Sequence, residues 1–255
     1  MLEIPLNSSA AGIRRLRLRT LEGRDELNLD PHGRTGFCDF VHGLAVNLQG
    51  GDMSPGQVRE LAVCDLEVIA ATLQCAYYGD WVESSLMCGR CGHGFDLSFD
   101  LAASLGSARK RHETEIGGPD ERGVFTLGDG RQFRLPTGVD ELAVADLDAA
   151  EAAGELCSRC VIHGDFESDP EVLDAAMEAT GPLLSQELHT TCPHCGAEKT
   201  TLFQVRQFFL EALASERRFL NYEVHYLARN YGWSRAEILG MTRDDRRLHV
   251  KLVLP

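Results

Sequence analysis

Three pairs of cysteines have the C-x-x-C spacing that is typical of zinc ligands, and together they use six of the nine cysteines in the chain. Two pairs lie in stretches of similar design, Cys88-Gly-Arg-Cys91-Gly and Cys192-Pro-His-Cys195-Gly. A tight turn at this spacing directs two thiolates to one point, and two such turns supply the four sulfur ligands of a tetrahedral zinc site. The pattern predicts that Cys88, Cys91, Cys192 and Cys195 bind one structural zinc ion.

The third pair, Cys157 and Cys160, follows a predicted helix instead of a strand. These thiols could be alternative ligands, could bind a second metal ion with His163 or Cys38, or could simply be packed. For any of the pairs, reduced cysteines buried in a core are the simplest alternative to a metal site. A redox dithiol is disfavoured, because no thioredoxin-like βαβ pattern surrounds any pair.

A four-thiolate zinc site leaves no open coordination position, whereas catalytic zinc keeps one for water or substrate. The chain contains neither an H-E-x-x-H nor a G-x-S-x-G motif. No cysteine or serine has a credible base beside it in the sequence. We therefore expect a protein that is not an enzyme and has no small-molecule substrate.

The elements that must position the cysteines read as strands. Residues 81–87 and 95–101 flank the first turn, and residues 186–191 and 200–205 flank the second. We expect an α+β fold, with small antiparallel strands around a zinc-ribbon-like site and a helical C-terminal lobe. The predicted division is a strand and hairpin segment over 1–52, a zinc-stapled core over 53–205 and the helical lobe over 206–255.

The alternation of leucine and arginine over residues 13–21 predicts a half-buried strand. A turn at 22–24 and a returning strand from Glu26 would complete a hairpin. The arginine row is read as a solvated face or as a docking edge for an acidic neighbour. Asp129-Gly130 predicts a second hairpin turn, and residues 104–122 read as a loop. Helices are expected over 54–78, 144–155, 169–179, 205–214, 215–231, 235–239 and 243–252.

The 255-residue chain has a net charge of −14 and a pI near 5.0, which argues against broad binding to nucleic acid or to anionic membranes. Residues 139–178 contain twelve acids and one base. An acidic face of this kind is usually solvated, but it could also repel nucleic acid or meet a basic partner. No apolar run is long enough to span a membrane, and no signal peptide is apparent. We expect synthesis in the reducing cytoplasm, where cysteines bind metal more often than they form disulfides.

The three short helices at the C-terminus also fit a helix-turn-helix outline. A zinc-ribbon DNA-binding transcriptional regulator is therefore the rival interpretation. The net charge and the lack of a continuous basic face count against it.

The segment from Phe219 to Arg247 resembles the C-terminal part of the T-even-phage-type baseplate protein family, which occurs in contractile phage tails and extracellular contractile injection systems. The resemblance is carried by a Glu-x-His helix at Glu223, a Trp-Ser turn at Trp233, a Glu-Ile-Leu helix and a short arginine-rich helix. The residues at 133–138 and the Cys192 knuckle are similar to the family as well. The stretch at 17–26 is a looser match, and residues 36–122 inherit little.

The resemblance implies a structural or assembly component of a baseplate, without catalysis, that is made in the cytoplasm and assembled in a phage-tail-like particle. The implied partners are other baseplate, spike or hub, tube or sheath proteins. Zinc would fix the strand core while the C-terminal helices contact a neighbouring subunit. Trp233 either belongs to that contact or packs locally.

Overall fold

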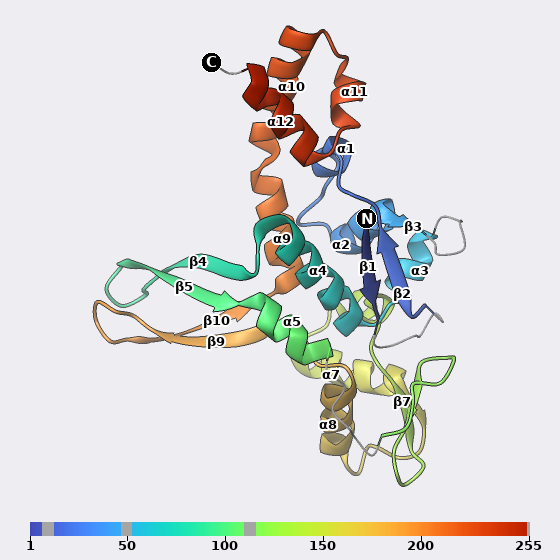
Figure 1. The fold of residues 1–255 in the computed structure, drawn as a ribbon. Coiled ribbons are helices and arrows are strands. Elements are labelled where there is room, and N and C mark those ends of the chain that lie inside the picture. The colour runs from blue at the N-terminus through green and yellow to red at the C-terminus, as the bar shows by residue number, and fades with distance from the viewer. Residues whose placement is uncertain (7–12, 47–52, 110–115, 254–255) are drawn as a thin grey trace. The chain divides into compact units, whose positions relative to one another are not determined.

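A computed structural model describes residues 1–6, 13–46, 53–109 and 116–253. It confirms the α+β prediction, since helices are combined with four small sheets whose described strand pairs are antiparallel (Figure 1). The chain divides into two compact units. The terminal unit comprises Met1–Ile4, Arg15–Val58 and Phe209–Pro255, and the central unit comprises Pro5–Arg14 and Arg59–Phe208.

The terminal unit contains a three-stranded sheet in the order β1 (Leu2–Pro5), β2 (Arg15–Leu18) and β3 (Ala45–Val46). Leu16 and Leu18 are buried, as the alternation predicts. The intervening arginines of β2 form ion pairs with Glu3. The basic face of β2 is therefore partly neutralised by its own sheet.

The expected returning strand after the turn at 22–24 is wrong. These residues form the helix α1 (Gly23–Leu27), which is followed by α2 (Gly36–Leu44). Asp25 accepts a hydrogen bond of 2.9 Å from the N–H of Glu22 and so closes a capping box at the start of α1. Besides β1, β2 neighbours β3, its antiparallel partner, whose residues come after α2.

The C-terminal helices are α9 (Val205–Ser215), α10 (Arg217–Tyr231), α11 (Arg235–Leu239) and α12 (Arg243–Val253). Gly232 ends α10 with a φ of +70°, and Ser234 caps α11, as predicted. Trp233 stacks on Tyr231 at a centroid distance of 4.3 Å and meets His249 edge-on at 5.0 Å. Trp233 therefore packs within the C-terminal helices, which is the local alternative considered from the sequence.

A buried ion network ties α1 to α10 and α12. The Arg246 side chain is 1% exposed, and its guanidinium donates to Glu26 at 2.7 Å and to Glu223 at 2.9 Å. Arg243 approaches Glu26 and Glu216, both at 3.3 Å. Each buried charge therefore has a partner of opposite sign, as burial requires.

In the central unit, α4 (Val63–Tyr78) is almost entirely buried over its first eleven residues, 63–73. The single helix expected over 54–78 is wrong, because α3 (Pro55–Arg59) and α4 are separate. Ala62 between them is extended and pairs with Thr137. The loop expected over 104–122 begins with helix α5 (Leu101–Arg109), whose first turn is capped by Asp100.

A three-stranded sheet of β6 (Val124–Thr126), β7 (Gln132–Arg134) and β8 (Val161–His163) packs with α7 (Ala149–Cys160) and α8 (Pro170–Thr180) around Phe125 and Phe133. Helix α6 (Gly138–Val144) packs against α7. The Asp129-Gly130 turn joins β6 and β7, with Gly130 at a φ of +90°. The third strand was not predicted. Cys157 and Cys160 lie within α7, instead of after a helix that ends at 155.

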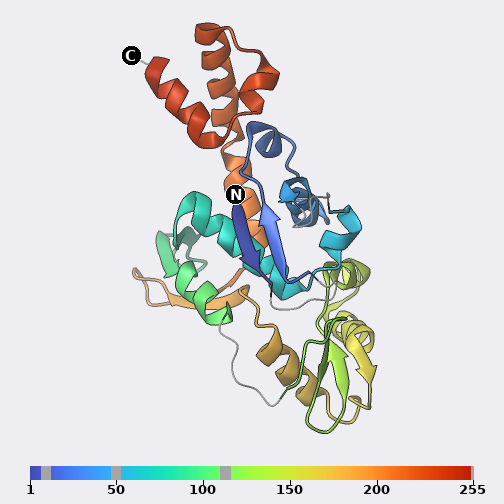
Figure 2. The same ribbon diagram turned by 45° about the vertical axis from the view of Figure 1, so that its right-hand side comes forward.

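Two long hairpins complete the central unit. They are β4 (Trp81–Met87) with β5 (Gly94–Asp100), and β9 (Gln186–Thr191) with β10 (Glu198–Phe203). Both hairpins project from the helices of this unit and lie beside each other in the two views (Figures 1 and 2). Their position in the sequence agrees with the strands expected around the cysteine turns. Within the described residues, no helix is long and apolar enough to cross a membrane.

Candidate metal centre

The two cysteine turns have the same backbone hydrogen bonds. In the first, the Cys88 N–H donates to the His93 carbonyl at 3.0 Å, and the Gly92 N–H donates to the Cys88 carbonyl at 2.9 Å. In the second, the corresponding bonds join Cys192 to Ala197 and Gly196 to Cys192, both at 2.9 Å. The local sequence C-x-x-C-G therefore builds one type of turn at each hairpin tip.

The glycine after the second cysteine has a conformational role in this turn. Gly92 has a φ of +72° and Gly196 has a φ of +68°, a region that residues with a Cβ rarely adopt. The positive φ lets the chain reverse direction after the second cysteine, so that both thiols of the turn can face the same point.

The turns bring four thiols together from positions about one hundred residues apart. The sulfur atoms of Cys88, Cys91, Cys192 and Cys195 all lie within 4.8 Å of one another. Across the hairpins, the Cys88 and Cys195 sulfurs are 3.7 Å apart, and the Cys91 and Cys192 sulfurs are 3.8 Å apart. A tetrahedral ion with metal–sulfur bonds of about 2.3 Å requires sulfur separations of about 3.8 Å. The cluster therefore has the size that a four-thiolate metal site needs.

The surroundings of these thiols shift the pKa values of Cys88 and Cys195 in opposite directions. Backbone N–H groups of Cys91 and Arg90 donate to Cys88 and lower the pKa of its thiol to about 6. The N–H of Ala197 acts in the same direction on Cys195, but burial and the neighbouring thiols outweigh it and raise the pKa of Cys195 to about 12. Four mutually close thiolates repel one another, and a bound cation removes that repulsion.

Other contacts hold the hairpins together near the thiols. The imidazole rings of His93 and His194 stack at a centroid distance of 4.5 Å. Lys199 of β10 donates to the Met87 carbonyl of β4 at 2.7 Å. Phe95 is buried with the cysteines. The pairing of the hairpins thus has apolar and polar contributions besides the thiols.

The bases of the hairpins are fixed by groups that the sequence did not reveal. Phe99 of β5 meets Phe203 of β10 edge-on at 4.9 Å. Glu67 of α4 is buried and accepts hydrogen bonds from the N–H groups of Leu184 and Ser185 at 2.6 and 2.9 Å. Glu67 therefore attaches the start of the second hairpin to α4. A single acid within a helix gives no sequence signal for such a bond across 117 positions.

The structure places the third C-x-x-C pair apart from the metal centre. Cys160 is fully buried on α7, and burial raises the pKa of its thiol to about 12. Cys157 packs against the core that contains Phe133. Over the described ranges of the chain, neither thiol belongs to a cluster of three or more ligand residues, with or without His163 or Cys38.

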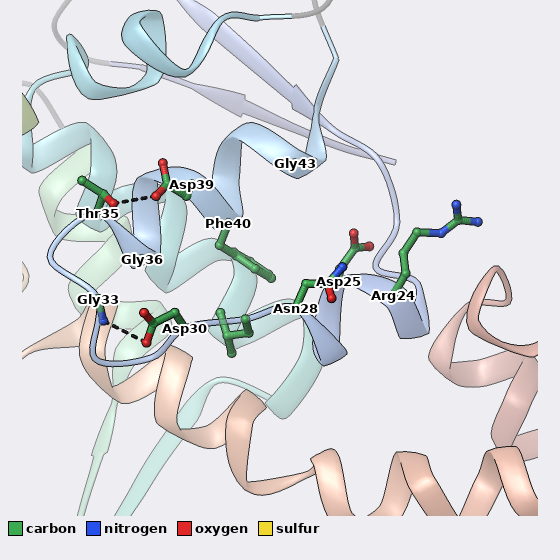
Figure 3. Close-up of a pocket in the computed structure, with 11 residues that line it drawn as sticks. Arg24, Asp25, Asn28, Asp30, Gly33, Thr35, Gly36, Asp39, Phe40 and Gly43 are labelled. Atoms are coloured by element: carbon green, nitrogen blue, oxygen red, sulfur yellow. Dashed lines mark hydrogen bonds between the residues drawn. The ribbon is translucent and has the colours of Figure 1, made fainter. Parts of the chain in front are cut away.

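A hollow of about 320 Å³ lies in the terminal unit between α1 and α2 (Figure 3). The carboxylates that line this hollow form hydrogen bonds and ion pairs with residues close to them in the sequence. Asp30 accepts a bond from the Gly33 N–H at 3.1 Å, and Asp39 accepts one from the Thr35 hydroxyl at 2.5 Å. Asp25 is paired with Arg19 at 2.7 Å. These contacts shape the loop between the two helices.

No family model, curated protein or solved structure matches the chain.

Proposed function

We propose that the chain is a structural or assembly component of the baseplate of a contractile phage-tail-like particle, stabilised by zinc. The observation that supports this most is the buried network of Glu26, Glu223, Arg243 and Arg246. Glu26 belongs to the loosely matching stretch near the start of the chain, and the other three belong to the more specific C-terminal segment. The charged residues of both stretches thus meet in one packing motif of the terminal unit.

This arrangement explains why a resemblance could extend over two separated stretches. The buried guanidinium of Arg246 needs acceptors, and it finds carboxylates in both stretches. A chance similarity of a short tail would not be expected to include the residue that completes its buried network.

We propose zinc as the metal of the cysteine cluster, in a structural role. Four thiolates in a tetrahedral set favour Zn²⁺, and with all four positions taken no site is left for water or substrate. Metal binding would then contribute folding free energy to the two hairpins, on the order of 10 kcal/mol in small zinc peptides. The proposed protein acts through protein contacts and not through catalysis, with spike or hub, tube, sheath or other baseplate proteins as partners.

The rival function, DNA binding by the C-terminal helices, is weakened by one observation. A recognition helix uses exposed basic side chains to reach phosphates and bases. In α12, Arg243 and Arg246 are buried in ion pairs, and Arg247 pairs with Glu216 at 2.5 Å. The arginines that suggested a basic helix are therefore largely occupied within the terminal unit.

The test is purification of tagged protein from a strain that produces contractile particles, followed by identification of proteins that remain bound after high-salt washing. Enrichment of tube, spike, sheath or other baseplate proteins would support the proposal. Binding of duplex DNA in a gel shift at physiological salt, with no enrichment of particle proteins, would replace it with the rival.

A further inference from the structure

The exposed face of α10 combines three aromatic side chains with basic ones. Phe219, Tyr222 and Tyr226 are 47%, 64% and 37% exposed, and their spacing of i, i+3 and i+7 places them along one side of the helix. Arg218 lies over the Phe219 ring at 4.7 Å. Arg229 is exposed further along the same helix. We call Arg218, Phe219, Tyr222, Tyr226 and Arg229 the aromatic–arginine face.

The side of α10 opposite to the aromatic–arginine face is the side that packs into the terminal unit. The buried residues of α10 are Leu220, Glu223 and Leu227, and Glu223 is the only acidic residue of this helix. In the described part of the chain, no ion pair involves Arg218 or Arg229. Tyrosine and arginine are enriched at the centres of protein interfaces, where ring stacking and charge-assisted bonds combine. The face therefore has the composition of a docking surface.

A complementary surface exists on the same chain. Helix α8 exposes Glu171, Asp174 and Glu178, again at i, i+3 and i+7, with the exposed small residues Ala175 and Ala179 between and beside them. Small residues let bulky rings approach the backbone of a facing helix, and the carboxylates can accept from guanidinium groups. Among the described contacts of the chain, none of these three acids forms an ion pair.

We propose that the aromatic–arginine face of one copy binds the acidic face of α8 in a second copy. A symmetric contact between two aromatic–arginine faces would place guanidinium groups against each other, which disfavours it. A head-to-tail contact instead pairs unlike surfaces and can continue from copy to copy. Nucleic acid is disfavoured as the occupant by the net charge of −14, although arginine and tyrosine also suit stacked bases.

The first measurement is sedimentation velocity of the zinc-loaded 255-residue chain from about 5 to 200 μM, at about 50 and 500 mM NaCl. We expect the average molar mass to increase with protein concentration. At the higher salt, the same increase should require an at least tenfold higher protein concentration, because charge pairs are screened. A monomer at every concentration and at both salts would overturn the proposal.

Two variants locate the contact. Tyr222→Ser/Tyr226→Ser and Glu171→Gln/Glu178→Gln should each weaken association at least tenfold. Leu248→Ser is the control. It removes an apolar side chain from α12 that is 56% exposed, between the values of Tyr226 and Tyr222, and should leave association unchanged. Circular dichroism and zinc content should match the wild type in all three, since the altered side chains lie on the surface.

Mixing the two defective variants separates a head-to-tail contact from other modes. The first retains an intact α8 face and the second an intact α10 face, so the mixture should form a complex of two copies and nothing larger. Failure of the mixture to associate, or equal self-association of each variant alone, would contradict the proposal. Binding of a fluorescent single-stranded oligonucleotide by the wild type, lost in Tyr222→Ser/Tyr226→Ser and without self-association, would assign the face to nucleic acid instead.

Discussion

Arg246 donates to Glu26 over a distance of 2.7 Å, although 220 positions separate the two residues in the chain. Both side chains are almost completely buried, at 1% and 2% exposure. The bond makes α1, near the start of the chain, part of the same packing unit as the last helix. The stability of this unit therefore depends on charges that are almost completely removed from water.

Replacing Arg246 with alanine should destabilise the protein by about 3–5 kcal/mol, because Glu26 and Glu223 would be left as buried charges without their shared partner. Urea unfolding followed by circular dichroism measures this loss. Lys251→Ala on the exposed side of α12 is the control and should change stability by less than about 0.5 kcal/mol. A loss below 1 kcal/mol for Arg246→Ala would contradict the importance of the network.

Removing one half of the cysteine cluster should remove the metal. We expect about one zinc ion per chain in the wild type and none in Cys192→Ser/Cys195→Ser, as measured by elemental analysis of purified protein. The hairpins should then lose cooperative unfolding, because the metal contributes directly to folding.

The matched control for this experiment is Cys157→Ser/Cys160→Ser, which alters a pair of the same spacing on α7. This variant should keep its zinc. Two zinc ions in the wild type, with one lost in this control, would show that the third pair forms a second site.

Gly92→Ala should weaken the metal site, because alanine would have to adopt a φ of +72° at a cost of about 1 kcal/mol or more. The expected result is faster transfer of zinc to a chromogenic chelator. Gly89→Ala in the same turn is the control, since Gly89 lacks a positive φ and has open space around its Cβ position. Equal rates of transfer for the two variants would show that the backbone conformation is unimportant.

Asp140 should contribute a pH-dependent part of the stability. Burial opposes its charge, but hydrogen bonds from Arg134 and Thr137 outweigh burial and lower the pKa of this carboxyl. A depressed folded-state pKa gives stability that is complete above the unfolded value of about 3.9 and is lost as the pH falls through the folded value. Asp140→Asn should therefore flatten the decline in stability below about pH 4.

Urea unfolding at several pH values between about 3 and 6 tests this expectation. Glu151→Gln, an exposed acid in the first turn of α7, serves as the control and should keep the wild-type slope. An unchanged slope in Asp140→Asn would mean that the bond to Arg134 contributes little.

Local patterns in the sequence predicted local structure well. The repeated C-x-x-C-G stretches identified both hairpin tips, and Asp129-Gly130 identified a turn, because each depends on bonds within a few residues. The end of α10 at Gly232 and the cap at Ser234 were visible for the same reason. The four cysteines could be grouped from among three pairs because both of their pairs are followed by glycine and flanked by predicted strands.

Long-range contacts explain what the sequence did not reveal. The alternation around Leu16 predicted β2, but one of its two neighbouring strands, β3, follows α2, and no pattern specified that pairing. The break between α3 and α4 arises at Ala62, which pairs with Thr137 far along the chain. Glu67 looks like an ordinary helical acid and Glu26 was expected in a strand, so neither showed its buried role before its partner was known. Burial with a remote partner leaves no periodic signal.

The hydrogen bond between Arg246 and Glu26 can form only after almost the whole chain has been synthesised. Residues 88 to 195 emerge from the ribosome before residue 246, so the four thiols are available to a metal ion while Glu26 still lacks its partner. Because domains generally fold as they leave the ribosome, the hairpins can be closed before the terminal unit has all of its helices. Until residue 246 emerges, Glu26 lacks the guanidinium with which it is buried in the folded protein.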